Sequence, residues 1–290
     1  MGKNKKNNHS NQKNTLNLWK DKNNLPKVSV CTPTFNRRPF IPIIIKCFNN
    51  QTYPKHLLEW IIIDDGTDPI EDLVKDHPNV KYFKYDKKMT LGKKRNLMHE
   101  KSTGSILVYM DDDDYYPPTR VYHAVDVLIK NPKADCAGSS EIYIYFKHIE
   151  KMYQFGPYGP NHATAGTFAF KRRLLETQKY NENASLAEEK EFLNNYKVPF
   201  VQLDPKHVIL VFSHIHNTFD KKKLLEGPPN QYVIESNKPI EYFVVEPEIK
   251  NFFINEIEEQ LEKYKPGRPE MKPDVLQQIK DIENKRLQMI

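Results

Sequence analysis

The chain has 290 residues, enough for one large domain or for a domain with appendages. It contains no run of about 18 apolar residues and no hydrophobic N-terminal leader, so neither a membrane span nor secretion is expected. The cysteines Cys31, Cys47 and Cys136 are spread out and odd in number. That usage favours buried reduced thiols and a cytoplasmic location.

The net charge of +6 comes from the N-terminal tail. Residues 1–27 hold seven lysines and one aspartate, so the rest of the chain is close to neutral. This distribution argues against a nucleic-acid partner, because nucleic-acid-binding domains carry their basic side chains on the folded part. Residues 1–26 are rich in Asn, Gln and Lys, which predicts a disordered basic tail.

Strand-like and helix-like segments alternate in the first part of the chain. The expected strands are 28–32, 59–63, 80–85 and 105–110, and the expected helices are 40–50, one beginning near 68, 91–102 and 119–129. This alternation predicts an α/β fold with a Rossmann-like, mostly parallel central sheet flanked by helices.

Unusual polar residues follow the carboxyl ends of these strands. They are Asn36, Arg37, Asp64, Asp65 and the four consecutive aspartates at 111–114. Open α/β sheets bind ligands at that edge, so we expect these side chains to meet in one crevice. The aspartate run is either a solvated acidic loop or a set of oxygen ligands for a divalent cation, which would offset the repulsion between the carboxylates.

The pattern changes in the second half. Short strands are expected at 134–139, 141–146, 152–155, 167–170 and 208–212, with a helix at 184–196. This half therefore looks mixed or antiparallel. Beyond Pro228 and Pro229, apolar residues at helical spacing predict two amphipathic helices, which could cap the main domain or join subunits. We divide the chain into a tail (1–26), a main domain (27–225) and a C-terminal helical extension (226–290).

Four motifs occur in a fixed order along the main domain. They are the segments 30–37, 63–67, 92–96 and 110–114, the last being a DXD motif. Together they make the chain resemble the family 2 glycosyltransferases of the GT-A fold, from residue 27 to about 220. The lysine- and asparagine-rich composition also resembles that of glycosyltransferases from large DNA viruses, in which case the location would be the host cytoplasm.

The resemblance implies an inverting transferase of the hexosyltransferase type. It would move a sugar from a nucleotide-diphosphate donor, with a UDP-sugar favoured, to a hydroxyl group of a glycan or glycosylated protein. It divides the main domain into a nucleotide-binding half, 27–118, and an acceptor half, 119–225. The implied donor-binding residues are Thr32, Pro33, Thr34, Asn36, Arg37, Asp64, Asp65, Lys93, Arg95, Asn96, Asp111 and Asp112.

The implied cofactor is Mn²⁺ or Mg²⁺, because both ions suit oxygen ligands. By the resemblance, Asp113 is the main metal ligand, with Asp111 beside it and His214 or His216 completing the shell. The assignment within the four aspartates is ambiguous by one residue. His214 is the preferred histidine.

The catalytic residues implied by the resemblance are an acidic pair at the start of a helix. Glu189 matches the family's usual aspartate, which would act as general base, and Glu188 precedes it. Because glutamate is longer by one methylene, either the helix lies further back or the base is a different residue. Gly166 and Thr167 match an acceptor-side loop of small residues.

Plainer interpretations stay open for single motifs, such as a simple turn at 64–66 or a solvated helix face at 93–95. A sugar-nucleotide nucleotidyltransferase would need a glycine-rich phosphate loop after the first strand, and residues 31–36 contain no glycine. A third hypothesis is a catalytically inactive scaffold on the same fold, tethered through its tail or C-terminal helices. Metal-dependent donor hydrolysis distinguishes the enzyme from the scaffold.

Overall fold

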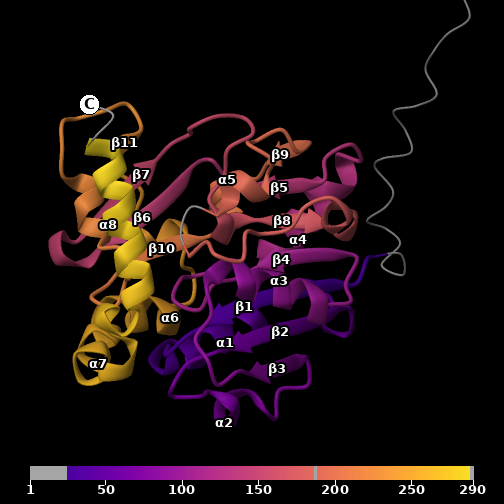
Figure 1. Ribbon diagram of the computed structural model, residues 1–290, viewed down its shortest axis with the longest axis horizontal. Coiled ribbons are helices and arrows are strands. Elements are labelled where there is room, and N and C mark those ends of the chain that lie inside the picture. Colours follow the sequence, from indigo (N-terminus) through magenta and orange to yellow (C-terminus); the bar gives the residue numbers. More distant parts are fainter. Residues whose placement is uncertain (1–24, 186–187, 288–290) are drawn as a thin grey trace, which may run out of the picture.

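The computed structural model describes residues 25–185 and 188–287. The predicted disordered tail, 1–26, thus lies almost entirely outside the described residues. Figure 1 shows a main sheet with helices on both faces and the C-terminal helices α7 and α8 standing beside it.

Seven strands form the main sheet, in the order β3-β2-β1-β4-β8-β5-β9. Their bounds are β1 Val28–Thr34, β2 Leu58–Asp64, β3 Val80–Lys84, β4 Ile106–Tyr109, β5 Cys136–Gly138, β8 Ala169–Lys171 and β9 Phe200–Gln202. Strand β1 pairs in parallel with β2 and β4, and β2 pairs in parallel with β3. Strand β8 is antiparallel to both β4 and β5. The predicted α/β fold, parallel in its first half and mixed in its second, is confirmed.

The strands read as continuous apolar runs because both faces of the sheet are covered. The helices are α1 Ile41–Asn49, α2 Glu71–Val74, α3 Leu91–Lys101, α4 Arg120–Lys130 and α5 Glu189–Phe192. Val30 and Ile62 belong to the core that includes residues of α1 and α4. Cys31 and Ile61 point to the other face, into the core that includes Met98 of α3. All three cysteines are buried and unpaired, as predicted.

A second sheet and the C-terminal helices extend this core. The second sheet has the order β10-β6-β7-β11. Its strands are β10 Leu210–Ser213, β6 Ile142–Phe146, β7 Lys151–Phe155 and β11 Val233–Ser236, followed by α6 Pro247–Asn251, a π-helical turn Phe252–Glu256, α7 Ile257–Lys263 and α8 Pro273–Leu287. Phe253 stacks on Phe212 of β10 at 4.1 Å between ring centroids, and Ile257 and Leu261 are buried. The first predicted C-terminal helix therefore packs against its own chain.

Three elements differ from the sequence predictions. The helix expected at 184–196 is the single turn α5, because Asn194, Asn195 and Tyr196 adopt positive φ angles of 49°, 54° and 61°, and asparagine tolerates the left-handed region. None of the residues of strands β9 and β11 is fully buried. These strands therefore do not require a continuous apolar run, and no such run predicted them.

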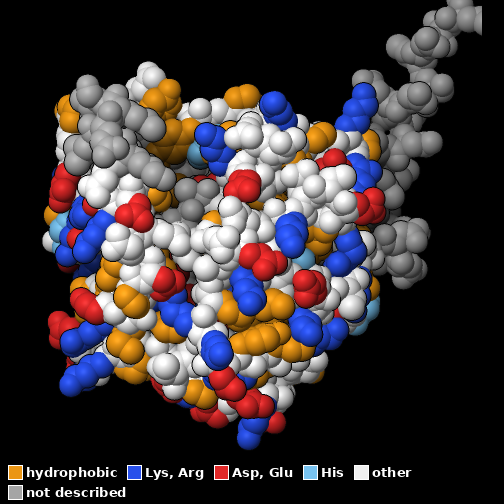
Figure 2. All heavy atoms as spheres, viewed as in Figure 1, with side chains coloured by type: hydrophobic (Ala, Val, Ile, Leu, Met, Phe, Trp, Pro, Cys, Tyr) orange, Lys and Arg blue, Asp and Glu red, His pale blue; other side chains and the backbone are white. Residues whose placement is uncertain are grey.

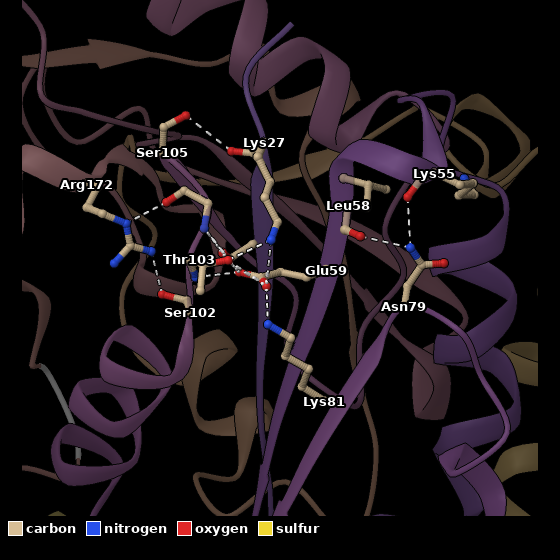
Figure 3. A network of polar contacts seen from close by, with 12 residues as sticks. Lys27, Lys55, Leu58, Glu59, Asn79, Lys81, Ser102, Thr103, Ser105 and Arg172 are labelled. Carbon is tan, nitrogen blue, oxygen red and sulfur yellow. Dashed lines mark hydrogen bonds and ion pairs between the residues drawn. The ribbon is translucent and has the colours of Figure 1, made fainter.

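A buried carboxylate ties together the amino-terminal ends of the parallel strands (Figure 3). Glu59 accepts hydrogen bonds from Ser29 Oγ at 2.5 Å, Lys81 Nζ at 2.7 Å and Thr103 N at 2.5 Å. Burial raises the pKa of Glu59, but the hydrogen bonds from Lys81, Ser29 and Thr103 outweigh burial and hold it well below its usual range. This network fixes the end of the sheet opposite the aspartate run.

Candidate functional site

A cavity of about 270 Å³ opens at the carboxyl ends of β1 and β4. This is the edge at which open α/β sheets bind ligands. Its walls come from segments far apart in the sequence, namely 33–37, 88–95, 111–113, 185, 217–221 and 272–275. A crevice therefore lies at the expected edge, lined by Arg37 and Asp111 to Asp113 but not by Asn36, Asp64, Asp65 or Asp114; we call it the cleft.

The aspartate run is held at the cleft by fully buried side chains. Arg120 donates from Nη2 to the carbonyl oxygens of Tyr109 at 3.2 Å and of Thr167 and Phe168 at 2.8 Å. The Tyr116 hydroxyl accepts from the backbone N–H of Asp111 at 2.6 Å. The start of the run is thus fixed relative to the loop around Thr167.

The four aspartates have unequal surroundings. Asp113 Oδ2 lies 3.3 Å from His214 Nε2 and 3.4 Å from Arg37 Nε. Burial raises the pKa of Asp113, but His214 and Arg37 outweigh burial and hold it well below the usual range. Burial and the charge of Asp113 raise the pKa of Asp112 to about 7 and that of Asp114 well above its usual value. One carboxylate is therefore firmly ionised between two that resist ionisation.

Asp114 does not line the cleft. Its Oδ1 accepts from the backbone N–H of Phe212 at 3.3 Å, which ties the run to β10. Asp111 is half-buried, and its Oδ1 lies 3.9 Å from Arg95 Nη1.

The two candidate catalytic glutamates differ in that one of them forms an ion pair. Glu188 is buried, and its Oε1 accepts from Arg95 Nε at 2.9 Å, while the Arg95 guanidinium lies 4.5 Å from the centre of the Tyr109 ring. Glu189 forms no ion pair with another described residue, and burial together with the charge of Glu188 raises the pKa of Glu189 to about 7. Glu189 can therefore accept a proton near neutral pH.

The two candidate metal histidines differ in position. His214 is buried, and burial lowers its pKa to about 3, so at pH 7 a neutral ring places its Nε2 3.3 Å from Asp113 Oδ2. Neither histidine lines the cleft; His216 packs against Tyr264, with ring centroids 6.2 Å apart. Neutral imidazole is the form that binds metals, so the geometry favours His214 over His216.

Five of the twelve predicted donor-binding residues line the cleft. They are Pro33, Arg37, Arg95, Asp111 and Asp112, together with the predicted metal ligand Asp113. Asp65 lies just behind, where it accepts from Lys94 Nζ at 2.8 Å and from the backbone N–H of Met89 at 2.5 Å.

Other predicted donor residues are engaged in the fold. The Thr32 hydroxyl accepts from Trp60 Nε1 at 2.8 Å, and the Asn36 amide donates to the carbonyl of Pro266 at 2.8 Å. Asp64 accepts from the backbone N–H groups of Gly66 and Ile70. Asn96 bonds the backbone of Tyr180, and Thr34 contributes its carbonyl to Lys94.

Lys93 is exposed and points away from the cleft, whereas Lys94 lines it. The prediction of Lys93 in the donor site thus differs from the structure by one residue. Helical spacing could have revealed this, since Leu91, Lys94, Arg95 and Met98 fall at positions i, i+3, i+4 and i+7 of one face. The cleft also contains Lys221 and Lys272, which no local sequence pattern predicted.

A family model and several relatives match this chain. The model of glycosyl transferase family 2 covers residues 29–188, more than half of the sequence. The chain belongs to glycosyl transferase family 2. The motifs predicted this family.

The curated relatives match over a short segment. The GalNAc(5)-diNAcBac-PP-undecaprenol beta-1,3-glucosyltransferase of Campylobacter jejuni is 34% identical over 97 residues, which cover 31% of this chain and 30% of that protein. The poly(ribitol-phosphate) beta-N-acetylglucosaminyltransferase TarS of Staphylococcus aureus is 30% identical over 94 residues, which cover 31% of this chain and 16% of TarS. The matched segments span less than a third of these relatives.

Solved structures share the fold over a longer part. S. aureus TarS 1–349 in complex with UDP-GlcNAc gives a TM-score of 0.51 at 20% identity, over 64% of this chain and 58% of that one. The mannosyltransferase PcManGT of Pyrobaculum calidifontis, in complex with GDP-Man and Mn²⁺, gives a TM-score of 0.53 at 17% identity, over 72% of this chain and 67% of that one. These likenesses confirm the GT-A fold.

Among the described residues, no helix is both long and apolar enough to cross a membrane. On the face shown in Figure 2, basic and acidic side chains are interspersed.

Proposed function

We propose that this glycosyltransferase moves a sugar from a nucleotide-diphosphate donor, with a UDP-sugar favoured, to a hydroxyl group of a glycan or glycosylated protein, with inversion at the anomeric carbon. The observation that carries this proposal is that Asp111, Asp112 and Asp113 share one cleft with the cations Arg37 and Lys94. A departing diphosphate needs such cations to offset the charge that it gains as the sugar–phosphate bond breaks.

A divalent cation, Mn²⁺ or Mg²⁺, is part of the proposal. No group of three or more His, Cys, Asp or Glu side chains that could hold a metal occurs among the described residues. The pair Asp113 and His214, 3.3 Å apart, nevertheless fits a site that the donor's phosphate oxygens and water complete, since Mg²⁺ is often held by one or two carboxylates plus substrate phosphates. When bound, the cation would act as a Lewis acid on the diphosphate. Asp111 and Asp112 would lie nearer the ribose.

Glu189 is the proposed general base. Its carboxylate would take the proton of the acceptor hydroxyl as that oxygen attacks the anomeric carbon. A pKa raised to about 7 by burial and by Glu188 matches this task, because a base works best when its pKa is near the operating pH. Glu188, paired with Arg95, would position the helix turn instead.

The loop at 165–167 is the proposed acceptor side. A Cβ atom at Gly166 would lie 2.8 Å from Asp111 Oδ2, so a larger residue here would require the Asp111 side chain to move. The Thr167 hydroxyl donates to Thr164 O at 2.6 Å and accepts from Ser139 N at 2.9 Å. Thr167 therefore supports the loop, and Gly166 leaves room for an acceptor sugar.

The test is ligand-dependent stability followed by turnover. We expect UDP with Mn²⁺ to raise the melting temperature, because a ligand that binds only the folded state stabilises it. A screen of nucleotide sugars should then give metal-dependent hydrolysis or transfer. If no nucleoside diphosphate shifts the melting temperature, the proposal is wrong. If donor binds but Asp113→Ala and wild type show equal background hydrolysis, the scaffold hypothesis is favoured.

Several narrower expectations stay predictions. They are the domain boundaries, the cytoplasmic location, a viral source and assembly of subunits through the C-terminal helices. A product with retained anomeric configuration would contradict both the inverting reaction and the role of Glu189.

A further inference from the structure

The segment 264–278, at the start of the last helix, lies against the cleft although it is far outside the residues that the family model matches. Gly267 O accepts from Arg37 Nη1 at 3.1 Å, and Asp274 accepts from Lys88 Nζ at 2.6 Å. Gln278 Oε1 accepts from the backbone N–H of Ser185 at 3.0 Å. These contacts hold the segment to three separate parts of the matched region, 29–188.

Lys272 is the residue of this segment that enters the cleft. It lines the cavity together with Asp112 and Asp113, and its ammonium lies 5.7 Å from the centre of the Phe35 ring. Its Nζ donates to the neutral Thr218 hydroxyl at 3.0 Å. Within the described part of the chain, no carboxylate lies within ion-pair distance of Lys272.

Lys272 is half-buried, and an ammonium group partly withdrawn from water without a paired anion is unfavourable. Burial and next the charge of Arg37 lower the pKa of Lys272 well below its usual value, and they outweigh the charges of Asp112 and Asp113, which raise it. A bound anion would pair with the Lys272 ammonium and favour its charged form. A phosphate oxygen is a suitable partner, since lysine acts on phosphates as a point charge.

We propose that the segment 264–278 forms one wall of the donor site and that Lys272 binds the diphosphate of the nucleotide donor. This inference rests on the proposed function, because it assumes that the cleft takes a nucleoside diphosphate. It adds a donor-binding residue that comes from the C-terminal extension. It also explains why that extension is tied to Arg37 and Lys88 on the nucleotide side.

The test compares UDP with uridine. Lys272→Met keeps the length and apolar stem of the side chain but removes its charge, and Lys280→Met is a matched control at an exposed position of α8. By calorimetry with Mn²⁺ present, Lys272→Met should bind UDP about 10- to 100-fold more weakly, the usual effect of losing a charge-assisted hydrogen bond. Uridine, which has no phosphate, should bind unchanged, and Lys280→Met should bind both ligands like wild type.

Lys272→Arg keeps the positive charge and should recover most of the UDP affinity. If Lys272→Met does not fold, Lys272→Gln, which also removes the charge, provides the measurement: a lower ratio of UDP to uridine affinity supports the proposal, and an unchanged ratio overturns it. Unchanged UDP affinity in a folded Lys272→Met variant, or equal loss of UDP and uridine, would also overturn it. If wild type binds no nucleoside diphosphate, the proposed function fails first.

Discussion

The two ends of the parallel sheet carry buried acidic groups of opposite character. At the amino-terminal ends, Glu59 accepts from Ser29, Lys81 and Thr103, so its oxygens are saturated. At the carboxyl ends, Asp111, Asp112 and Asp113 open into a cavity, and three of the four consecutive carboxylates have pKa values raised by burial and by the charge of Asp113.

This difference separates a structural acid from a binding one. A saturated carboxylate stabilises the fold and has no remaining lone pair for a ligand. A crowded, partly paired group of carboxylates is unfavourable in the protein alone, and a bound cation or ligand can supply what is missing. The same sheet thus uses acidic residues to fix one end and to bind at the other.

The largest expected effect comes from replacing the acidic side chain with its amide at each end of the parallel sheet. Asp113→Asn should lower kcat/KM by about 10³-fold or more, because it removes the proposed metal ligand. Glu59→Gln should leave kcat/KM of the folded enzyme unchanged but lower the free energy of unfolding by roughly 2 kcal/mol, because the buried network loses a charged acceptor. Steady-state kinetics and urea unfolding measure the two quantities.

Asp114→Asn is the control within the run. Since Asp114 bonds Phe212 N and does not line the cleft, its substitution should reduce kcat/KM less than that of Asp113. The opposite order would show that the assignment within the run is off by one residue.

The next effect concerns Glu189. If it is the base, kcat/KM should rise with pH and level off above a midpoint near pH 7, because only the ionised carboxylate accepts a proton. Glu189→Gln should lower kcat by about 10²- to 10⁴-fold, remove that limb and leave UDP affinity unchanged. If kcat/KM of the variant still rises with pH around pH 7, the general base is a different residue.

Stability gives an independent check on the same residue. The folded-state pKa of Glu189 is raised from 4.5 to about 7, so the folded state holds the proton more tightly than the unfolded state. Stability from this group is therefore lost as pH rises from about 4.5 to 7. Glu189→Gln should melt higher than wild type at pH 8, and this difference should shrink at pH 5.

The smallest expected effect distinguishes neighbouring lysines of α3. Lys94→Met should reduce kcat/KM about 10-fold, because Lys94 positions Asp65 through an ion pair of 2.8 Å at the cleft wall. Lys93→Met, at an exposed position, should be within about 2-fold of wild type, as for most surface substitutions. Kinetics on both variants measure the difference; equal losses would argue that α3 faces the cleft differently.

The sequence alone determined the order of strands and helices in the first half and the place of the binding edge. Continuous apolar strands, each followed by polar residues, require a covered parallel sheet with its site at the carboxyl ends. The aspartate run and Arg37 could be named because each follows a predicted strand, whereas Arg95 and the pair at 188–189 were named through the resemblance to family 2 glycosyltransferases.

Only the tertiary structure decided which of these residues line the cleft and which pair with one another. In the structure, Lys94 rather than Lys93 lines the cleft. Glu188 pairs with Arg95, whereas Glu189 forms no ion pair with another described residue. The tertiary structure also brought Lys272 from 160 residues beyond the aspartates, near enough to line the same cavity as Asp112. Local periodicity predicts which face of an element is buried, but contacts between distant segments depend on how the whole chain packs, and no short-range pattern records them.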